Sequence, residues 1–208
     1  MKRLPRLDPY RAAGLLSLVN FSFAAWHLYL GLTSPSRWFM ALGCYYLFLL
    51  GARLTVLGVS RKSNTEVMPK AVGMLLILTA LPLIALVIIS SVKPVDEVGT
   101  VYHEIVMITI ALYAFTKITL AVINLIQAKK KNSASERSLR SISLADALVS
   151  IASLQRSMLL SFGSMAEADI RLFNTLTGTG VCVSVLLIGV ILYAYRKLES
   201  RTESVAKH

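Results

Sequence analysis

Six apolar runs, each long enough to cross a lipid bilayer as a helix, constrain the fold of this chain more than any other feature. A membrane-spanning helix needs about 20 mostly apolar residues, because each residue advances the helix by about 1.5 Å and the hydrocarbon core is about 30 Å thick. The sequence predicts such spans at residues 12–32, 38–59, 71–92, 101–127, 143–165 and 175–195. Because the intervening segments are too short to fold separately, we expect residues 1–208 to form one all-helical, six-span membrane domain.

The composition agrees with an integral membrane protein. Hydrophobic residues make up 55% of the chain, charged residues make up 16%, and the mean hydropathy is +0.65. These values are too apolar for a soluble domain of 208 residues. Both cysteines, Cys44 and Cys182, lie inside predicted spans, so they do not indicate a disulfide framework.

Basic residues are distributed unequally between the two sides that six alternating helices would create. The formal net charge is +11, and 16 of the 22 Lys and Arg residues fall on the side that holds both chain ends. The other side carries Arg37, Lys93 and Arg171. By the positive-inside rule, both termini are expected in the cytoplasm. The bias accounts for the basic residues as topology signals and contacts to anionic lipid, and it argues against nucleic-acid binding.

A polar stripe follows the fifth predicted span at helical spacing. Its members are Ser143, Asp146, Ser150, Ser153, Ser157, Ser161 and Ser164. Unpaired hydroxyl groups are costly in hydrocarbon, so the stripe is expected to face the other helices. Two interpretations remain open: close helix packing, in which each Ser bonds a carbonyl four residues earlier, and a water-accessible pathway.

Ionisable residues within spans indicate a binding site near the cytoplasmic side. Arg53, Lys117 and Asp146, together with Asn124, are expected to form one inner layer, with Tyr46 and Tyr113 as further donors. If Asp146 pairs with one cation, the other is left to bind an anion, and the guanidinium of Arg53 suits phosphate, sulfate or a carboxylate. The alternative is that Arg53 and Lys117 extend to the inner lipid headgroups.

A second layer is expected in the outer half, from His27, Glu104 and Arg156. Arg156 lies at the edge of the serine stripe and is expected to turn toward Glu104 or His27. For His27, an interhelical hydrogen bond is the favoured interpretation over a metal or proton role. Trp38, Tyr102 and Tyr195 lie at span ends, where an interfacial aromatic belt accounts for them.

No motif for membrane catalysis, nucleotide binding or metal binding is present, so we expect no cofactor and no metal, and an enzyme acting on lipid is the least favoured function. The sequence favours a small transporter, channel-like protein or substrate-binding subunit with an anion-preferring site. The alternative is a non-catalytic regulatory or assembly subunit. The polar segment 128–141 is expected to be the longest inner loop, available to a membrane or cytosolic protein partner. The expected location is the cell membrane, in a bacterium; the oligomeric state is left open.

Overall fold

The computed structural model describes residues 9–33, 37–60, 68–92, 104–127, 134–162 and 166–205, and no strand occurs among them. They form helices α1 (Pro9–Thr33), α2 (Arg37–Ser60), α3 (Met68–Leu78), α4 (Ala80–Val92), α5 (Glu104–Gln127), α6 (Ala134–Phe162) and α7 (Glu167–Val205). The protein is therefore all-helical over its described length, as the apolar runs predict.

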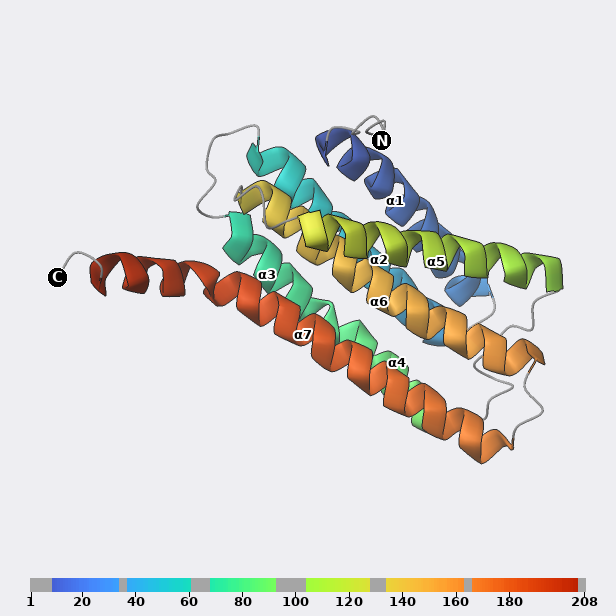
Figure 1. Cartoon of the computed structure of the whole chain (residues 1–208). Coiled ribbons are helices and arrows are strands. Elements are labelled where there is room, and N and C mark those ends of the chain that lie inside the picture. Colours follow the sequence, from blue (N-terminus) through green and yellow to red (C-terminus); the bar gives the residue numbers. More distant parts are fainter. Residues whose placement is uncertain are drawn as a thin grey trace.

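Successive helical segments run in opposite directions, with α3 and α4 forming one bent segment (Figure 1). As a result, α1 begins and α7 ends at the same end of the bundle (Figure 1). Helix α7 has 39 residues, which corresponds to about 58 Å. Its last turns extend beyond the other helices, as Figure 1 shows.

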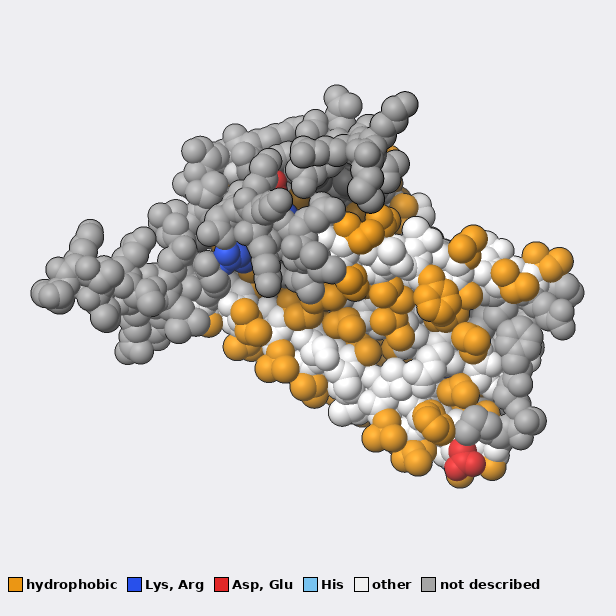
Figure 2. All heavy atoms as spheres, viewed as in Figure 1, with side chains coloured by type: hydrophobic (Ala, Val, Ile, Leu, Met, Phe, Trp, Pro, Cys, Tyr) orange, Lys and Arg blue, Asp and Glu red, His pale blue; other side chains and the backbone are white. Residues whose placement is uncertain are grey.

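Four helical segments of the described chain are long and apolar enough to cross a membrane: Ala13–Thr33, Arg37–Val59, Met68–Val92 and Glu167–Ala194. Large apolar side chains on their outer faces are exposed, among them Leu18, Leu54 and Leu187. Hydrophobic side chains also spread over the described part of the face seen in Figure 2. An apolar exterior of this extent is typical of a membrane-embedded protein, in which lipid covers it.

The most polar helix, α6, lies in the interior of the bundle. It packs against α2, α3, α5 and α7 (Figure 1). Of its side chains that the structure describes, Met158 alone is largely exposed. A helix surrounded in this way places its hydroxyl and charged groups against protein instead of lipid, which explains how a sequence so rich in Ser is accommodated.

Helix α6 also begins earlier than the sequence suggests. Residues 134–141, expected in an inner loop, are helical, and Ser138 and Leu139 are buried. The Ser138 hydroxyl donates a hydrogen bond to the Ala134 carbonyl at 2.9 Å, and Arg140 pairs with Glu136 one turn earlier at 3.1 Å. These local bonds satisfy polar groups within the helix, so a polar composition does not prevent the segment from being helical.

The third predicted span is interrupted at Thr79, between α3 and α4. Pro82 explains the position of the break, because its ring nitrogen has no proton to donate to Leu78, four residues earlier. Backbone hydrogen bonds from Thr79 to Leu75 (3.0 Å) and from Leu83 to Thr79 (3.4 Å) connect the two halves. The expected kink at Leu81-Pro82 therefore lies one turn before the proline.

Helices α3 and α7 approach closely at two glycines. A methyl group added to Gly73 would lie 2.7 Å from the Tyr193 backbone nitrogen and 2.8 Å from the Gly189 carbonyl oxygen. One added to Gly189 would lie 3.1 Å from the Gly73 carbonyl oxygen. Small residues at this crossing allow backbone-to-backbone contact, which is how membrane helices gain packing energy without a hydrophobic driving force.

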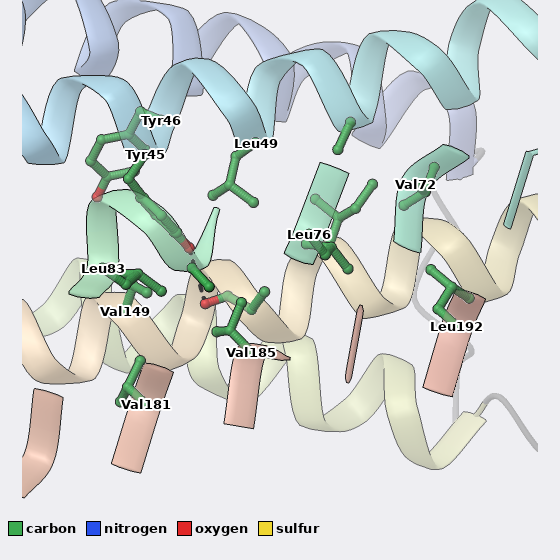
Figure 3. Close-up of a cluster of buried hydrophobic side chains, with 14 of the residues drawn as sticks. Tyr45, Tyr46, Leu49, Val72, Leu76, Leu83, Val149, Val181, Val185 and Leu192 are labelled. Atoms are coloured by element: carbon green, nitrogen blue, oxygen red, sulfur yellow. Dashed lines mark hydrogen bonds between the residues drawn. The ribbon is translucent and has the colours of Figure 1, made fainter. Parts of the chain in front are cut away.

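The apolar core lies between α2, α3, α4, α6 and α7. Figure 3 shows Leu49 of α2 directed toward Leu76 of α3 and Val185 of α7. Helix α1 instead packs on α2, and α5 packs on α6 (Figure 1). Both helices therefore lie at the periphery of the bundle, and α5 reaches the interior at the level where the charged side chains meet.

Candidate functional site

Three ionisable side chains from three helices meet in the interior. Asp146 of α6 accepts a hydrogen bond from Arg53 of α2, with 3.2 Å between Nη2 and Oδ2. Its other carboxylate oxygen, Oδ1, accepts from Lys117 of α5, with 2.7 Å between the two atoms. The sequence predicts that these residues share a layer, and the structure brings them together. It differs in that one carboxylate is shared by both cations.

This charged cluster, Arg53–Asp146–Lys117, is almost fully shielded from the surroundings. Arg53 and Asp146 are each 1% exposed, whereas Lys117 is 10% exposed. Removing one partner of a buried ion pair costs roughly 3–5 kcal/mol, because the remaining charge is left in a poorly solvating environment. The cluster therefore ties α2, α5 and α6 to one another, and Lys117 forms its more accessible side.

Ser150 extends the cluster by one turn of α6. Its hydroxyl accepts a hydrogen bond from the Lys117 ammonium at 3.1 Å and donates one to the Asp146 carbonyl at 2.8 Å. One ammonium group therefore bridges a carboxylate and a hydroxyl that lie on the same face of the helix. The spacing of four residues between Asp146 and Ser150 makes this arrangement possible.

Tyr45 contributes a contact that sequence reasoning missed. It is fully buried, and its hydroxyl donates a hydrogen bond to the Ala145 carbonyl on α6 at 3.2 Å. Figure 3 shows the side chain directed from α2 toward α6. The expected donor was its neighbour Tyr46. Two adjacent tyrosines on a helix point about 100° apart, so the sequence alone does not distinguish which of them faces α6.

Tyr46 instead belongs to an aromatic group between α1 and α2. Its ring lies 5.5 Å from those of Phe23 and His27, measured between centroids. The Nδ1 atom of His27 lies 2.7 Å from the Phe23 carbonyl oxygen, four residues earlier in α1. The hydrogen bond of His27 is therefore within its own helix, although an interhelical one was the favoured expectation.

Arg156 lies on α6 ten residues after Asp146, about 15 Å along the helix axis. It is buried, its Nη1 atom donates to the Ser90 hydroxyl at 2.7 Å, and its guanidinium carbon lies 3.9 Å from the centre of the Trp38 ring. Trp38, expected at the membrane interface, is partly buried by this stacking. Arg156 thus contacts α2 and α4, and the side chain of Glu104, one of its two expected partners, lies outside the described residues.

No protein-family model, curated protein or solved structure matches the chain.

The serine stripe makes mainly local hydrogen bonds. Ser157 donates to the Ser153 carbonyl at 3.0 Å, as Ser150 does to that of Asp146. Ser143, Ser153 and Ser161 are partly buried, and Ser164 lies outside the described residues. These carbonyl contacts are those expected if the stripe serves close helix packing. Two of its members, Asp146 and Ser150, also bind Lys117.

Three predicted site residues have side chains outside the described part of the structure: Glu104, Tyr113 and Asn124, all on α5. Among the residues that are described, no group of His, Cys, Asp and Glu has the arrangement of a metal site. Asn20 of α1 is 1% exposed, and its amide atoms find no hydrogen-bond partner within the described ranges.

Proposed function

We propose that this chain is a small multi-pass membrane protein of transporter or substrate-binding type, whose charged cluster binds a small anion. Six helical segments would cross the cell membrane, with both termini in the cytoplasm. The observation that carries the proposal is the position of Asp146, 1% exposed, between Arg53 at 3.2 Å and Lys117 at 2.7 Å. Ionisable groups are rare at membrane depth because they are costly there, and they usually serve transport or binding.

The chemistry of the cluster favours an anion as its ligand. The three side chains comprise a guanidinium, an ammonium and one carboxylate. An incoming phosphate, sulfate or carboxylate offers the same kind of oxygen acceptors as Asp146 and would exchange with it on one or both cations. Lys117, as the more accessible member, is the expected point of entry. Exchange of this kind lets a buried cation bind and release an anion without ever losing all its acceptors.

The arrangement of charges along the bundle supports the proposed orientation. Lys70 at the start of α3, and Arg137 and Arg140 in the first turns of α6, lie at the end of the bundle where α1 begins (Figure 1). The opposite end carries Arg37 and Arg171, the latter 4.0 Å from Glu167. We assign the end with Lys70, Arg137 and Arg140 to the cytoplasm, where these residues would also contact anionic lipid.

A second candidate is a regulatory or assembly subunit without transport activity. The local hydrogen bonds of Ser150 and Ser157 favour it, because they give the serine stripe a packing role that needs no water pathway. In that case the charged cluster would serve to connect helices. The two candidates differ in whether an added anion is bound.

The test is anion-dependent stabilisation of the purified protein, measured as the midpoint of thermal unfolding in detergent against phosphate, sulfate and chloride at constant ionic strength. Phosphate or sulfate is expected to raise the midpoint in a saturable manner. Asp146→Asn should respond at lower anion concentration, because both cations lose their internal carboxylate. Lys117→Gln should lose the response, because it leaves a neutral Arg53–Asp146 pair.

Arg171→Gln provides the matched control, since it removes an exposed cation of a helix-end pair and should leave the response unchanged. The anion site is ruled out if neither the parent nor Asp146→Asn is stabilised by any of the three anions. It is also ruled out if Arg171→Gln weakens the response as much as Lys117→Gln does.

A further inference from the structure

A pocket separate from the charged cluster lies between α2, α4, α6 and α7, around Arg156. It offers about 40 Å³ to water-sized spheres. One water molecule occupies roughly 10–15 Å³ on that measure, so the pocket has room for a few waters or one small organic group. Val149 and Arg156 are seven residues apart on α6, so the lining covers about 10 Å along the helix axis.

The two ends of the pocket differ in chemistry. Leu83 of α4, Val149 of α6 and Val181 of α7 form one end, and Figure 3 shows these three side chains within one part of the core. The other end has Ser90, Arg156 and Asn174, each seven residues from the apolar residue on the same helix. In α7, which runs in the opposite direction, the polar residue comes before the apolar one. Each helix therefore supplies an apolar residue at one level and a polar residue about two turns away.

Arg156 is held in a fixed orientation at the polar end. The hydrogen bond to the Ser90 hydroxyl restrains one edge of the guanidinium group, and the stacking on Trp38 restrains one face. A guanidinium oriented in advance binds a carboxylate with a smaller loss of conformational entropy than a free one. Of the described residues that line the pocket, Arg156 is the charged one.

We propose that this pocket binds a short-chain aliphatic carboxylate, with the carboxylate on Arg156 and the hydrocarbon chain between Leu83, Val149 and Val181. The charge of the site selects an anion, its apolar end selects a hydrocarbon chain, and its volume limits the chain to a few carbons. A lipid headgroup would supply an anion as well, but it would not place a short chain at the apolar end. The proposal does not depend on anion binding by the charged cluster, because Arg156, which would hold the carboxylate, lies ten residues after Asp146, about 15 Å along α6.

The test uses Trp38 as a reporter, because it contacts Arg156. The chain has two Trp residues, and the other, Trp26, is largely exposed, so Trp26→Phe leaves Trp38 as the single indole fluorophore. Titration of this protein in nanodiscs with hexanoate is expected to change the emission in a saturable manner. Hexanamide, which lacks the charge, and acetate, which lacks the chain, should each bind at least tenfold more weakly.

Substitutions then test whether Arg156 binds the carboxylate of hexanoate. Arg156→Gln should remove the preference for hexanoate over hexanamide, and Arg156→Lys should restore part of it. Lys117→Gln, in the charged cluster, should leave hexanoate affinity unchanged, which separates this site from the proposed function. Repeating the titration in nanodiscs of phosphatidylglycerol and of phosphatidylcholine tests whether an anionic lipid headgroup occupies the pocket instead. Such a headgroup would compete with hexanoate in phosphatidylglycerol and not in phosphatidylcholine.

Equal responses to hexanoate and hexanamide in the parent would overturn the proposal, as would hexanoate affinity that survives Arg156→Gln. Loss of hexanoate binding in phosphatidylglycerol alone would overturn the choice of ligand in favour of a lipid headgroup. The comparison of the three ligands on the parent protein needs no substitution at Arg156, so it decides the question even if Arg156→Gln does not fold.

Discussion

At the scale of single residues, one carboxylate and one hydroxyl of α6 accept hydrogen bonds from two cations. The Asp146 carboxylate accepts from two cations on two neighbouring helices, and the Ser150 hydroxyl accepts from one of them and donates to its own helix. In a low-dielectric environment each such contact is stronger than in water, and each lost contact is more costly. We therefore expect substitutions here to change stability and any ligand binding together.

Tyr45→Phe tests a single polar contact of this interior without changing any charge. The variant loses the hydrogen bond to the Ala145 carbonyl and should lower the free energy of unfolding by about 0.5–1.5 kcal/mol. Reversible unfolding in mixed micelles with increasing SDS measures this value. Tyr29→Phe is the control, since Tyr29 is largely exposed and should change stability little. Equal effects of the two variants would mean that the hydroxyl of Tyr45 contributes nothing specific.

At the scale of helices, the position of α6 follows from its composition. A helix with Ser or Asp at every third or fourth place is unsuited to lipid contact, and here four other helices cover it. Its interior position and the meeting of Arg53, Lys117 and Asp146 could be anticipated from the spacing of the polar residues. The partners of Arg156 could not, because Trp38 and Ser90 lie on helices whose rotation about their axes the sequence leaves undetermined.

The crossing of α3 and α7 gives a prediction at this scale. Gly73→Ala should destabilise the protein by about 1–3 kcal/mol, because the added methyl group meets backbone atoms of α7 that cannot move aside separately. Gly180→Ala, on α7 itself, is the control: its methyl group meets nothing within 4 Å, and it should be neutral or slightly stabilising. Unfolding in SDS mixtures compares the two. A Gly73→Ala protein as stable as the Gly180→Ala protein would contradict the close approach.

At the scale of the whole molecule, the number of segments that cross the membrane determines on which side each loop lies. Four helical segments of the described chain meet the requirements of length and apolar content; α6 is not among them, and the described part of α5 contributes a shorter apolar stretch, Ala114–Ile123. With both termini in the cytoplasm, as proposed, the link between α5 and α6 is cytoplasmic if both of these helices cross the membrane. If neither crosses, that link lies outside the cell, although the two termini stay on one side in both cases.

Cysteine labelling distinguishes these arrangements. In a background with Cys44→Ser and Cys182→Ala, we introduce Ala134→Cys at the first residue of α6 or Asp169→Cys near the start of α7. With six crossings, a membrane-impermeant maleimide should label Asp169→Cys in intact cells and should label Ala134→Cys after the cells are opened. Labelling of Ala134→Cys in intact cells would contradict the six-span arrangement.

The sequence by itself determined the helical class, the membrane-crossing length of the apolar segments and the inward orientation of the polar stripe. These features depend on local spacing and on the cost of placing polar groups in hydrocarbon, both of which are properties of each segment alone. The tertiary structure decided which tyrosine faces α6, how one carboxylate divides between two cations, and that Arg156 stacks on Trp38 beside a pocket. Those outcomes depend on the relative rotation and depth of packed helices, which are fixed by close contacts such as Gly73 with Gly189 and are not encoded in any single segment.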